Sequence, residues 1–211
     1  MTASRHAAIF EVHDASSVAL EGLADGHTRR QRALMQVPGF LRTQRWTAVD
    51  NPGCTLVIYD VEHSGVLESP AYRTVSAELT RGGSSQPVGH SLVRYASEQI
   101  LPGDALSPDE ARGLLFLAMN IDPEHEEEFN RWNDTEHFPR LAAVDGVIAA
   151  RRFRVSDGPH RYLAVYHARE AGVIDGPAWL AARETPWTWS IRPHTRDRWR
   201  MIATREQDLP R

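Results

Sequence analysis

Apolar positions along the chain fall into short runs separated by stretches with helical spacing. The order is strand, helix, strand, strand, helix, strand, and it occurs twice. In the second half, Gly113–Met119 is an apolar run typical of a strand. Asp122-Pro123 then predicts the start of a helix, because aspartate caps helices and proline fits their first turn. Phe129 and Trp132 are three residues apart in this helix, so we expect both to face the sheet.

The remaining elements are predicted from similar runs and from turn residues. In the second half they are strands at Val147–Val155 and Arg161–Arg169 around the turn Asp157-Gly158-Pro159, a helix from about Asp175 to Thr185, and a strand within Thr195–Thr204. In the first half they are Ala7–Val12, a helix through Met35, Phe40–Val49, Thr55–His63, a helix from Ser69, and Ser91–Ala96. The junction Ser97–Ala111 is expected to hold a turn at Pro102-Gly103 and a short capped helical start at Ser107–Glu110.

The two halves also match residue by residue. When Val37–Tyr72 is set against Val144–Trp179, a constant shift of 107 residues without a gap, 11 of 36 positions are identical. The identical pairs are Val37/Val144, Gly39/Gly146, Arg45/Arg152, Asp50/Asp157, Pro52/Pro159, Leu56/Leu163, Tyr59/Tyr166, Gly65/Gly172, Val66/Val173, Pro70/Pro177 and Ala71/Ala178. A gapless match that includes glycines, prolines and an aromatic residue predicts a tandem duplication.

This organisation predicts the fold class. Two strand–helix–strand halves in one four-stranded antiparallel sheet give the ferredoxin-like layout, with helices on one face only. The other face needs a cover, and the second unit supplies a sheet in the same chain. We therefore expect an α+β protein with two tandem ferredoxin-like (βαββαβ) halves, whose antiparallel sheets pack as a pseudo-dimeric α/β barrel. The division is placed near Asp104, which gives units 1–103 and 104–211.

Composition narrows the classes of function. The net charge of −4 and the pI of about 6.2 predict no nucleic-acid partner, and no basic run predicts a membrane surface. The first residues lack the apolar core of a signal peptide, and no run approaches the roughly 18 apolar residues of a membrane span. A cytoplasmic protein is therefore expected. Cys54 is the only cysteine, which excludes disulfides and cysteine-based metal sites within one chain.

A group of segments in the second half carries a family resemblance. They are Glu128-Phe129, Trp132-Asn133, Glu136-His137-Phe138-Pro139-Arg140-Leu141, Val144-Asp145-Gly146, Ala150–Phe153, Tyr162–Tyr166, Thr185–Thr188 and Arg192-Pro193-His194. Together they resemble the dimeric α/β-barrel superfamily and, within it, the EthD-like proteins. The resemblance covers nearly all of the second half and, more weakly, the first. Its most specific element is a His-x-Pro at a helix end followed by Val-x-Gly, where the family has proline in place of Asp145.

The resemblance implies a small-molecule pocket more than one reaction. The superfamily includes cofactor-free monooxygenases, lactone isomerases, dehydratases and cyclases that act on aromatic or polyketide substrates, and it also includes haem-binding members. Our leading hypothesis is a cofactor-independent enzyme of the dehydratase, cyclase or isomerase type that acts on an aromatic or polyketide-like small molecule. The alternatives are a cofactor-free monooxygenase and a non-catalytic protein that binds a hydrophobic ligand or haem. An exposed helical face would also allow a homodimer.

His137 is the candidate general acid or base, because an imidazole both accepts and donates protons at neutral pH. Glu136 precedes it, and Asn133 lies one helical turn back, within reach of an orienting hydrogen bond. Pro139 is expected to end or kink the helix, so that His137 lies near a helix C-terminus where the dipole raises its pKa. The alternative is a surface or capping histidine. Arginines occupy the matching positions of the first half, which is therefore expected to be structural.

Further residues are candidates for substrate binding. Trp132 and Trp187 belong to five tryptophans in the second half, which either line an aromatic pocket or fill the core. Tyr166 and His194 are the other two candidates beside the strands, with packing as the alternative for Tyr166.

Arg151 and Arg152 are neighbours on one predicted strand, so their side chains are expected on opposite faces of the sheet. One of them is then free to contact an anionic or carbonyl group of a ligand. A structural ion pair is the simplest role for Arg152, because Arg45 matches it in the repeat. The histidines are spread over different elements, so no metal site is predicted.

Overall fold

The computed structural model describes residues 5–15, 20–81 and 90–205. Strands and helices follow one another in the predicted order. The strands are β1 Ala7–Ala15, β2 Phe40–Ala48, β3 Cys54–Val61, β4 His90–Leu101, β5 Gly113–Ile121, β6 Val147–Asp157, β7 Tyr162–Ala168 and β8 Thr195–Arg205. The α-helices are α1 Leu20–Leu34, α2 Pro70–Arg81, α3 Glu126–Trp132, α4 Phe138–Ala142, α5 Pro177–Arg183 and α6 Pro186–Ile191.

The strands form one closed antiparallel barrel in the order β1-β3-β2-β8-β5-β7-β6-β4. Each half contributes four neighbouring strands, and the two sets join at both edges, where β2 pairs with β8 and β4 pairs with β6. The predicted α+β barrel is therefore confirmed. That the halves arose by tandem duplication, and that they divide near Asp104, stay predictions of the repeat.

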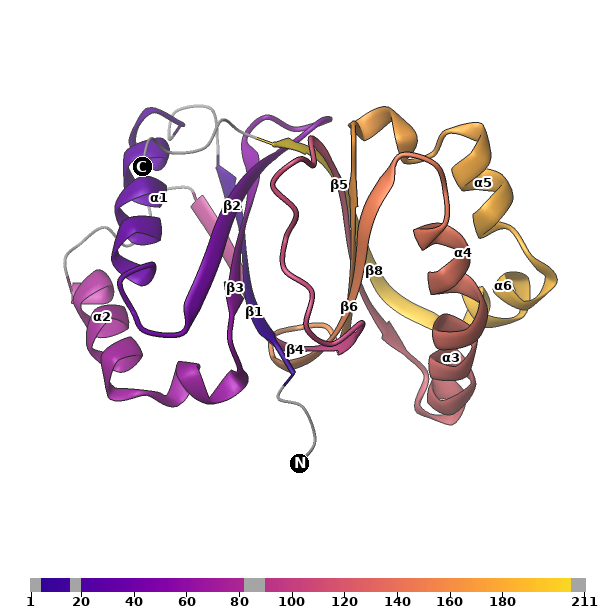
Figure 1. Ribbon diagram of the computed structural model, residues 1–211, viewed down its shortest axis with the longest axis horizontal. Coiled ribbons are helices and arrows are strands. Elements are labelled where there is room, and N and C mark those ends of the chain that lie inside the picture. Colours follow the sequence, from indigo (N-terminus) through magenta and orange to yellow (C-terminus); the bar gives the residue numbers. More distant parts are fainter. Residues whose placement is uncertain (1–4, 16–19, 82–89, 206–211) are drawn as a thin grey trace.

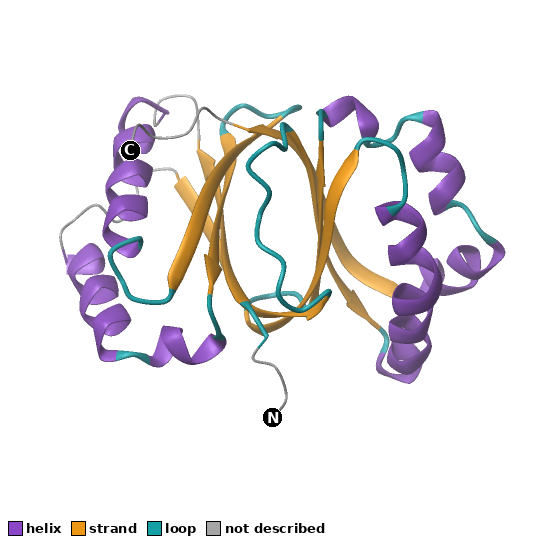
Figure 2. Cartoon of the chain, in the orientation of Figure 1, coloured by secondary structure: helices purple, strands orange, loops and turns teal. Residues whose placement is uncertain are grey.

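Helices cover the two outer faces of the barrel. Figure 1 shows α1 and α2 beside the strands of the first half and α3 to α6 beside those of the second, with the strands between them (Figure 2). The first outer layer packs around Leu34, Tyr59 and Tyr72, and the second around Tyr166 and Trp179. In the part of the chain that the structure describes, no helix has the length and apolar character needed to cross a membrane.

A glycine turn recurs before the second strand of each half. Gly39 has a φ of +93° and Gly146 a φ of +90°, a left-handed conformation that side chains disfavour. A Cβ atom at Gly39 would lie 2.5 Å from Cγ2 of Val66, and one at Gly146 would lie 2.7 Å from Cγ2 of Val173. Both the backbone angle and the close valine therefore require glycine, which explains why these residues are identical in the repeat.

The barrel interior is apolar along most of its length, with Phe10, Trp46, Phe116 and Phe153 among its buried side chains. One end is polar instead. There the chain between β4 and β5 runs across the barrel (Figure 2), and side chains inside the barrel bind it. Gln44 Nε2 donates to the carbonyl of Pro108 at 2.8 Å, and Gln99 Nε2 donates to the carbonyl of Ala105 at 2.8 Å. This segment therefore closes one end of the barrel.

Three local expectations are corrected. Ser107–Glu110 is not helical, because the backbone N–H of Ser107 donates to the Asp60 carboxylate at 2.7 Å and is held against the barrel. Of the two outcomes expected at Pro139, the helix end is wrong: a π turn at Asn133–His137 leads directly into α4, which continues to Ala142, and the kink stays a prediction. Beyond Thr185 a further helix forms, α6, whose first turn is capped by the Thr185 hydroxyl, which accepts from the Thr188 N–H at 3.0 Å.

Candidate functional site

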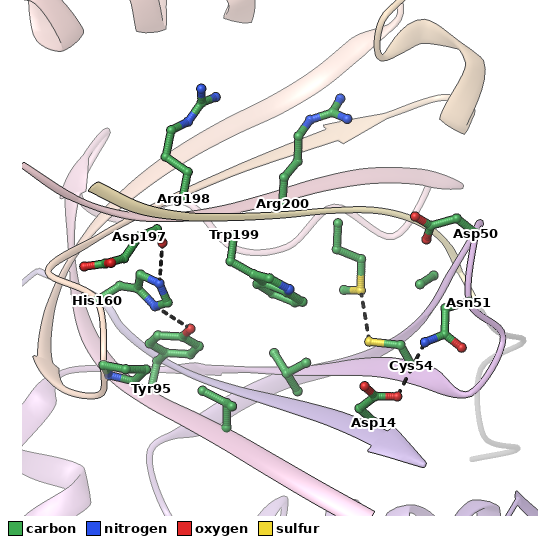
Figure 3. A pocket seen from close by; sticks show the side chains of 15 residues that line it. Asp14, Asp50, Asn51, Cys54, Tyr95, His160, Asp197, Arg198, Trp199 and Arg200 are labelled. Atoms are coloured by element: carbon green, nitrogen blue, oxygen red, sulfur yellow. Dashed lines mark hydrogen bonds between the residues drawn. The ribbon is translucent and has the colours of Figure 1, made fainter. Parts of the chain in front are cut away.

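A cavity of about 610 Å³ opens at the barrel end opposite the closing segment. Figure 3 shows it from close by. Its lining comes from β1, β2, β3, β4 and β8 and from the turns between β2 and β3 and between β6 and β7: Val12, Asp14, Ala48, Asp50, Asn51, Cys54, Val93, Tyr95, Pro159, His160, Asp197, Arg198, Trp199, Arg200 and Met201. The barrel-mouth cavity thus combines apolar walls with a few polar groups, as small-molecule sites do.

Tyr95 and His160 form a hydrogen-bonded pair at this cavity (Figure 3). The Tyr95 hydroxyl lies 2.9 Å from Nδ1 of His160, and Nε2 of His160 lies 2.7 Å from the backbone carbonyl of Asp197. A carbonyl only accepts, so Nε2 carries a proton, and Nδ1 of the neutral ring accepts from Tyr95. Burial raises the pKa of Tyr95 to about 12, which keeps its hydroxyl protonated at neutral pH. The pair is therefore aligned to pass a proton from Tyr95 to His160.

The charged side chains around the cavity mouth are mostly acidic. Asp14, Asp50 and Asp197 are exposed there, and burial together with Asp14 and Asp50 raises the pKa of the Cys54 thiol to about 11. Arg198 and Arg200 belong to the lining through β8, but their side chains point away from the cavity (Figure 3). The mouth therefore disfavours an anionic ligand by charge.

The predicted catalytic residue His137 lies elsewhere, under the helices of the second half. Its ring stacks on Trp132 with 4.1 Å between centroids, and its Nδ1 is buried with no hydrogen-bond partner among the described residues. Burial, and then the positive charges of Arg192, Arg183 and Arg198, lower the pKa of His137 to about 3. The expected rise of this pKa is therefore wrong: desolvation and three arginines outweigh any helix dipole.

The other two predicted catalytic residues make their hydrogen bonds to groups other than the His137 ring. Glu136 accepts a hydrogen bond from the Thr185 hydroxyl at 2.6 Å. Asn133 donates to the backbone carbonyl of Phe129 at 3.1 Å, inside its own helix. Trp187, a predicted binding residue, donates to Glu128 at 3.2 Å. The Glu136 and Trp187 side chains thus connect different helical segments, and the Asn133 side chain bonds within its own helix.

The two neighbouring arginines face opposite sides of the sheet, as predicted. Arg151 points into the barrel, where it is buried and pairs with Asp60 at 2.6 Å. Arg152 points to the helices, pairs with Asp134 at 2.6 Å and lies over the Tyr162 ring. Both are committed to ion pairs within the chain, and neither lines the barrel-mouth cavity.

The last predicted binding residues are also separated. Tyr166 is buried edge-on against Trp179, and burial raises its pKa. His194 stacks on His125 with 3.4 Å between ring centroids, and its Nδ1 is 3.7 Å from the Asp122 carboxylate. Of the tryptophans, only Trp199 lines the barrel-mouth cavity. The second half therefore does not gather its tryptophans into one aromatic pocket.

Near His137, four arginines and two acids form what we call the arginine network. Its members are Arg183, Arg192, Arg198, Arg200, Glu184 and Asp175. The arginines that lower the pKa of His137 all belong to it. Sequence reasoning missed it because its members come from α5, the turns on either side of α5, the 3₁₀ turn after α6, and β8.

The first half was expected to be only structural, yet it holds a buried polar cluster. Glu11 is fully buried and receives both Nε and Nη2 of Arg30, at 2.8 and 2.5 Å. His13 lies 3.9 Å from Glu11 and its ring is 4.1 Å from that of His27. Burial and then the Glu11 charge raise the pKa of Tyr59. The available signal was the pair Glu11 and His13, which follows four apolar residues, Ala7–Phe10, on the same strand.

The described residues can be tested for their ability to hold a metal ion or a haem. Among residues 5–15, 20–81 and 90–205, no three His, Cys, Asp or Glu side chains stand close enough to hold a metal ion. Haem is implied for some members of the resembled superfamily, yet His137 does not have the surroundings of an axial ligand. An axial histidine normally donates its second ring N–H to a carboxylate or carbonyl, and Nδ1 of His137 lacks such a partner in the described part of the chain.

Comparison with known proteins defines the class of this fold. No protein-family pattern and no curated protein sequence matches the chain. Solved structures do match over nearly its whole length, and with the closed barrel they show the dimeric α/β-barrel fold.

Three of these structures illustrate the match. An anthrone oxidase-like protein is 13% identical with a TM-score of 0.69, covering 97% of this chain and 92% of that one. A monooxygenase candidate from Fusobacterium nucleatum subsp. nucleatum is 8% identical with a TM-score of 0.63, covering 98% and 94%. A mutant chlorite dismutase from Candidatus Nitrospira defluvii is 8% identical with a TM-score of 0.63, covering 98% and 93%. Identities this low show a shared fold alone, and the EthD-like assignment stays a prediction.

Proposed function

We propose that the chain is a cofactor-independent enzyme that binds an uncharged aromatic or polyketide-like molecule in the barrel-mouth cavity and first removes a proton from it. The observation that carries this proposal is the Tyr95–His160 pair in a cavity of about 610 Å³. Small-molecule sites measure roughly 300–1,000 Å³, so an aromatic ring system fits. The names of the matched structures, a monooxygenase candidate and an anthrone oxidase-like protein, support the enzyme class and the aromatic substrate.

The pair moves the proton in two coupled transfers. The Tyr95 oxygen accepts an acidic C–H or O–H proton of the substrate while its own proton passes to Nδ1 of His160. The products are a substrate anion and a protonated His160, whose Nε2–H stays bound to the Asp197 carbonyl at 2.7 Å. Trp199, Met201 and the other apolar walls keep water from the anion.

Two reaction types share this first step. In an isomerase, cyclase or dehydratase, the proton returns to another atom of the substrate or leaves with hydroxide as water. In a cofactor-free monooxygenase, the anion reacts with O₂. For anthrone, the CH₂ group becomes C=O with one oxygen atom, and the other oxygen leaves as water with the two hydrogens. All electrons come from the substrate, so no reductant is needed. The matched structures support this second type.

The His137 segment is the second candidate site. It is the element that most resembles EthD-like proteins, and on that resemblance we propose EthD-like membership for the chain. His137 is neutral in the folded protein, so only a base role is open to it, and a pKa of about 3 makes it a weak one. The cavity pair therefore has the stronger case.

The test measures oxygen uptake and anthraquinone formation with anthrone, and binding through quenching of Trp199 fluorescence. Tyr95→Phe and His160→Gln should each lower the rate by about 10²–10⁴, the usual contribution of a general acid or base. His137→Gln is the matched control and should leave the rate unchanged. Anthrone conversion without oxygen uptake would assign the non-oxidative type.

The opposite result for the two histidine variants would assign the reaction to the His137 segment. If His137→Gln abolished turnover and His160→Gln did not, the reaction would belong under the second-half helices. If anthrone and 1-naphthol neither reacted nor changed the fluorescence relative to a Trp199→Phe variant, the proposal for uncharged aromatic substrates would be wrong.

A further inference from the structure

Asn120, near the end of β5, binds both segments that meet at His160. Its Oδ1 accepts the backbone N–H of Arg161 at 2.8 Å. Its Nδ2 donates to the Asp197 carboxylate at 2.9 Å and to the Pro159 carbonyl at 3.4 Å. This orientation of the amide places its oxygen at a donor and its nitrogen at two acceptors, so every group is matched. One side chain thus joins the turn that carries His160 to strand β8.

Strand β8 is irregular where it passes Asn120. Between the paired positions Ala118↔Trp199 and Asn120↔Arg196, β5 advances by two residues and β8 by three, so β8 contains a β-bulge. Asp197 lies in this bulge with a φ of +51°, a left-handed conformation that few side chains other than aspartate and asparagine tolerate. Such a conformation persists only where neighbouring contacts hold it, and the hydrogen bond from Asn120 is one of them.

The bulge gives His160 its backbone partner. Carbonyls of a regular antiparallel strand bond to the neighbouring strands, but here the ladder is interrupted and the Asp197 carbonyl accepts from Nε2 of His160 at 2.7 Å (Figure 3). A carbonyl oxygen has only lone pairs, so it would repel an unprotonated Nε2 and favours the proton on that nitrogen. Nδ1 of the neutral ring is then the acceptor that faces the Tyr95 hydroxyl at 2.9 Å.

We propose that Asn120 is a positioning residue that fixes His160 in the Nε2–H tautomer, by holding the Asp197 bulge and the turn of His160 together. Asn120 does not line the barrel-mouth cavity, so it acts through His160 and not on a ligand. The opposite tautomer has its proton on Nδ1, where it blocks transfer from Tyr95. The effect on turnover rests on the proposed function, whereas the tautomer is a property of the unliganded protein.

The first test is ¹⁵N NMR of the His160 ring in the unliganded protein at alkaline pH, where a histidine ring is neutral. The signals are assigned by their loss in His160→Gln. The unchanged protein should show a protonated Nε2 and an unprotonated Nδ1. Asn120→Ala should change the tautomer ratio about two- to twelvefold, the effect of one hydrogen bond, and draw the two nitrogen shifts toward each other. Unchanged shifts would overturn the proposal.

A reciprocal exchange distinguishes positioning from general stability. Asn120→Asp places two carboxylates face to face and should disturb the tautomer as Asn120→Ala does. Adding Asp197→Asn restores a donor opposite an acceptor, with only the 3.4 Å contact to Pro159 lost, and should recover most of the shifts. Gly146→Ala is the control, because it strains the turn at the other end of β6. Equal shift changes in Gly146→Ala and Asn120→Ala, or no recovery in the double variant, would also overturn the proposal.

Turnover of anthrone separates this inference from the proposed function. Asn120→Ala should lower kcat about ten- to a hundredfold with little change in KM, because a small misplacement of a reacting group has an effect of this size. A changed tautomer with unchanged turnover would support the positioning of His160 and contradict the proposed reaction. An unchanged tautomer, with turnover still lost in His160→Gln, would support the reaction and overturn the role of Asn120.

Discussion

Replacing Asp60 by asparagine should destabilise the protein more than any surface change of equal size. Arg151 and Asp60 pair at 2.6 Å, and their side chains are only 1% and 2% exposed. Asp60→Asn leaves the Arg151 charge buried without a counter-charge, which costs about 3–5 kcal/mol. The other oxygen of Asp60 accepts the Ser107 N–H at 2.7 Å, and the amide nitrogen of asparagine cannot accept there.

The expected loss is a large share of total stability, because domains are stable by only about 5–15 kcal/mol. For a chain of 211 residues it corresponds to a fall in Tm of roughly 6–20 °C. Urea unfolding followed by tryptophan fluorescence gives the free energy of unfolding by linear extrapolation. Asp145→Asn is the surface control: its pair with Arg169 is 3.4 Å long and mostly exposed, so less than about 1 kcal/mol should be lost.

Two results would refute this reasoning. The first is a loss for Asp60→Asn no greater than that of Asp145→Asn. The second concerns the double variant Asp60→Leu, Arg151→Met, which removes both charges and should recover most of the stability. A double variant as unstable as Asp60→Asn would show that packing, and not the uncompensated charge, causes the loss.

Two further predictions concern stability. The pKa values of His137 and His167 are both lowered from 6.5, chiefly by burial, so below pH 6.5 the unfolded chain takes up protons that the folded chain does not. The free energy of unfolding should thus fall as the pH decreases from 6.5 towards 4, by up to about 1.4 kcal/mol per pH unit for each histidine. Urea unfolding at pH 7.5 and at pH 5.5 measures this difference. Equal free energies of unfolding at the two pH values would contradict the prediction. Gly146→Ala should cost about 1–3 kcal/mol of stability, from backbone strain and from the close contact with Val173. Adding Val173→Ala to this variant should relieve only the contact. A Tm of Gly146→Ala equal to that of the unchanged protein would contradict the turn assignment.

The order of elements followed from the sequence because apolar runs and turn residues act over short distances. The barrel followed from one physical requirement, the cover for the open face of each sheet. The opposite directions of Arg151 and Arg152 followed from strand alternation. By contrast, the helical signal at Ser107–Glu110 was overridden by Asp60, a residue 47 positions earlier whose carboxylate holds the Ser107 N–H.

The sites depended on contacts that no local pattern records. His137 was expected to gain a proton easily from its place in a helix, but Arg183 and Arg192, which lie about 50 positions later in the chain, help to keep it neutral. Tyr95 and His160 meet because β4 and the turn after β6 lie side by side at one barrel end, and 65 residues separate them. Pairings of this kind depend on the closed barrel, so they could be recognised only from the structure.

The segment between β4 and β5 that crosses one end of the barrel has a kinetic consequence. As far as the described residues show, the cavity at the other end is then reached only through its own mouth, so a ligand leaves by the path through which it came. A bound product and an incoming substrate exclude each other in such a blind-ended site. If the chain has the enzymatic function proposed above, each turnover would therefore wait for product release, and a product that dissociates slowly would inhibit competitively with respect to its own substrate.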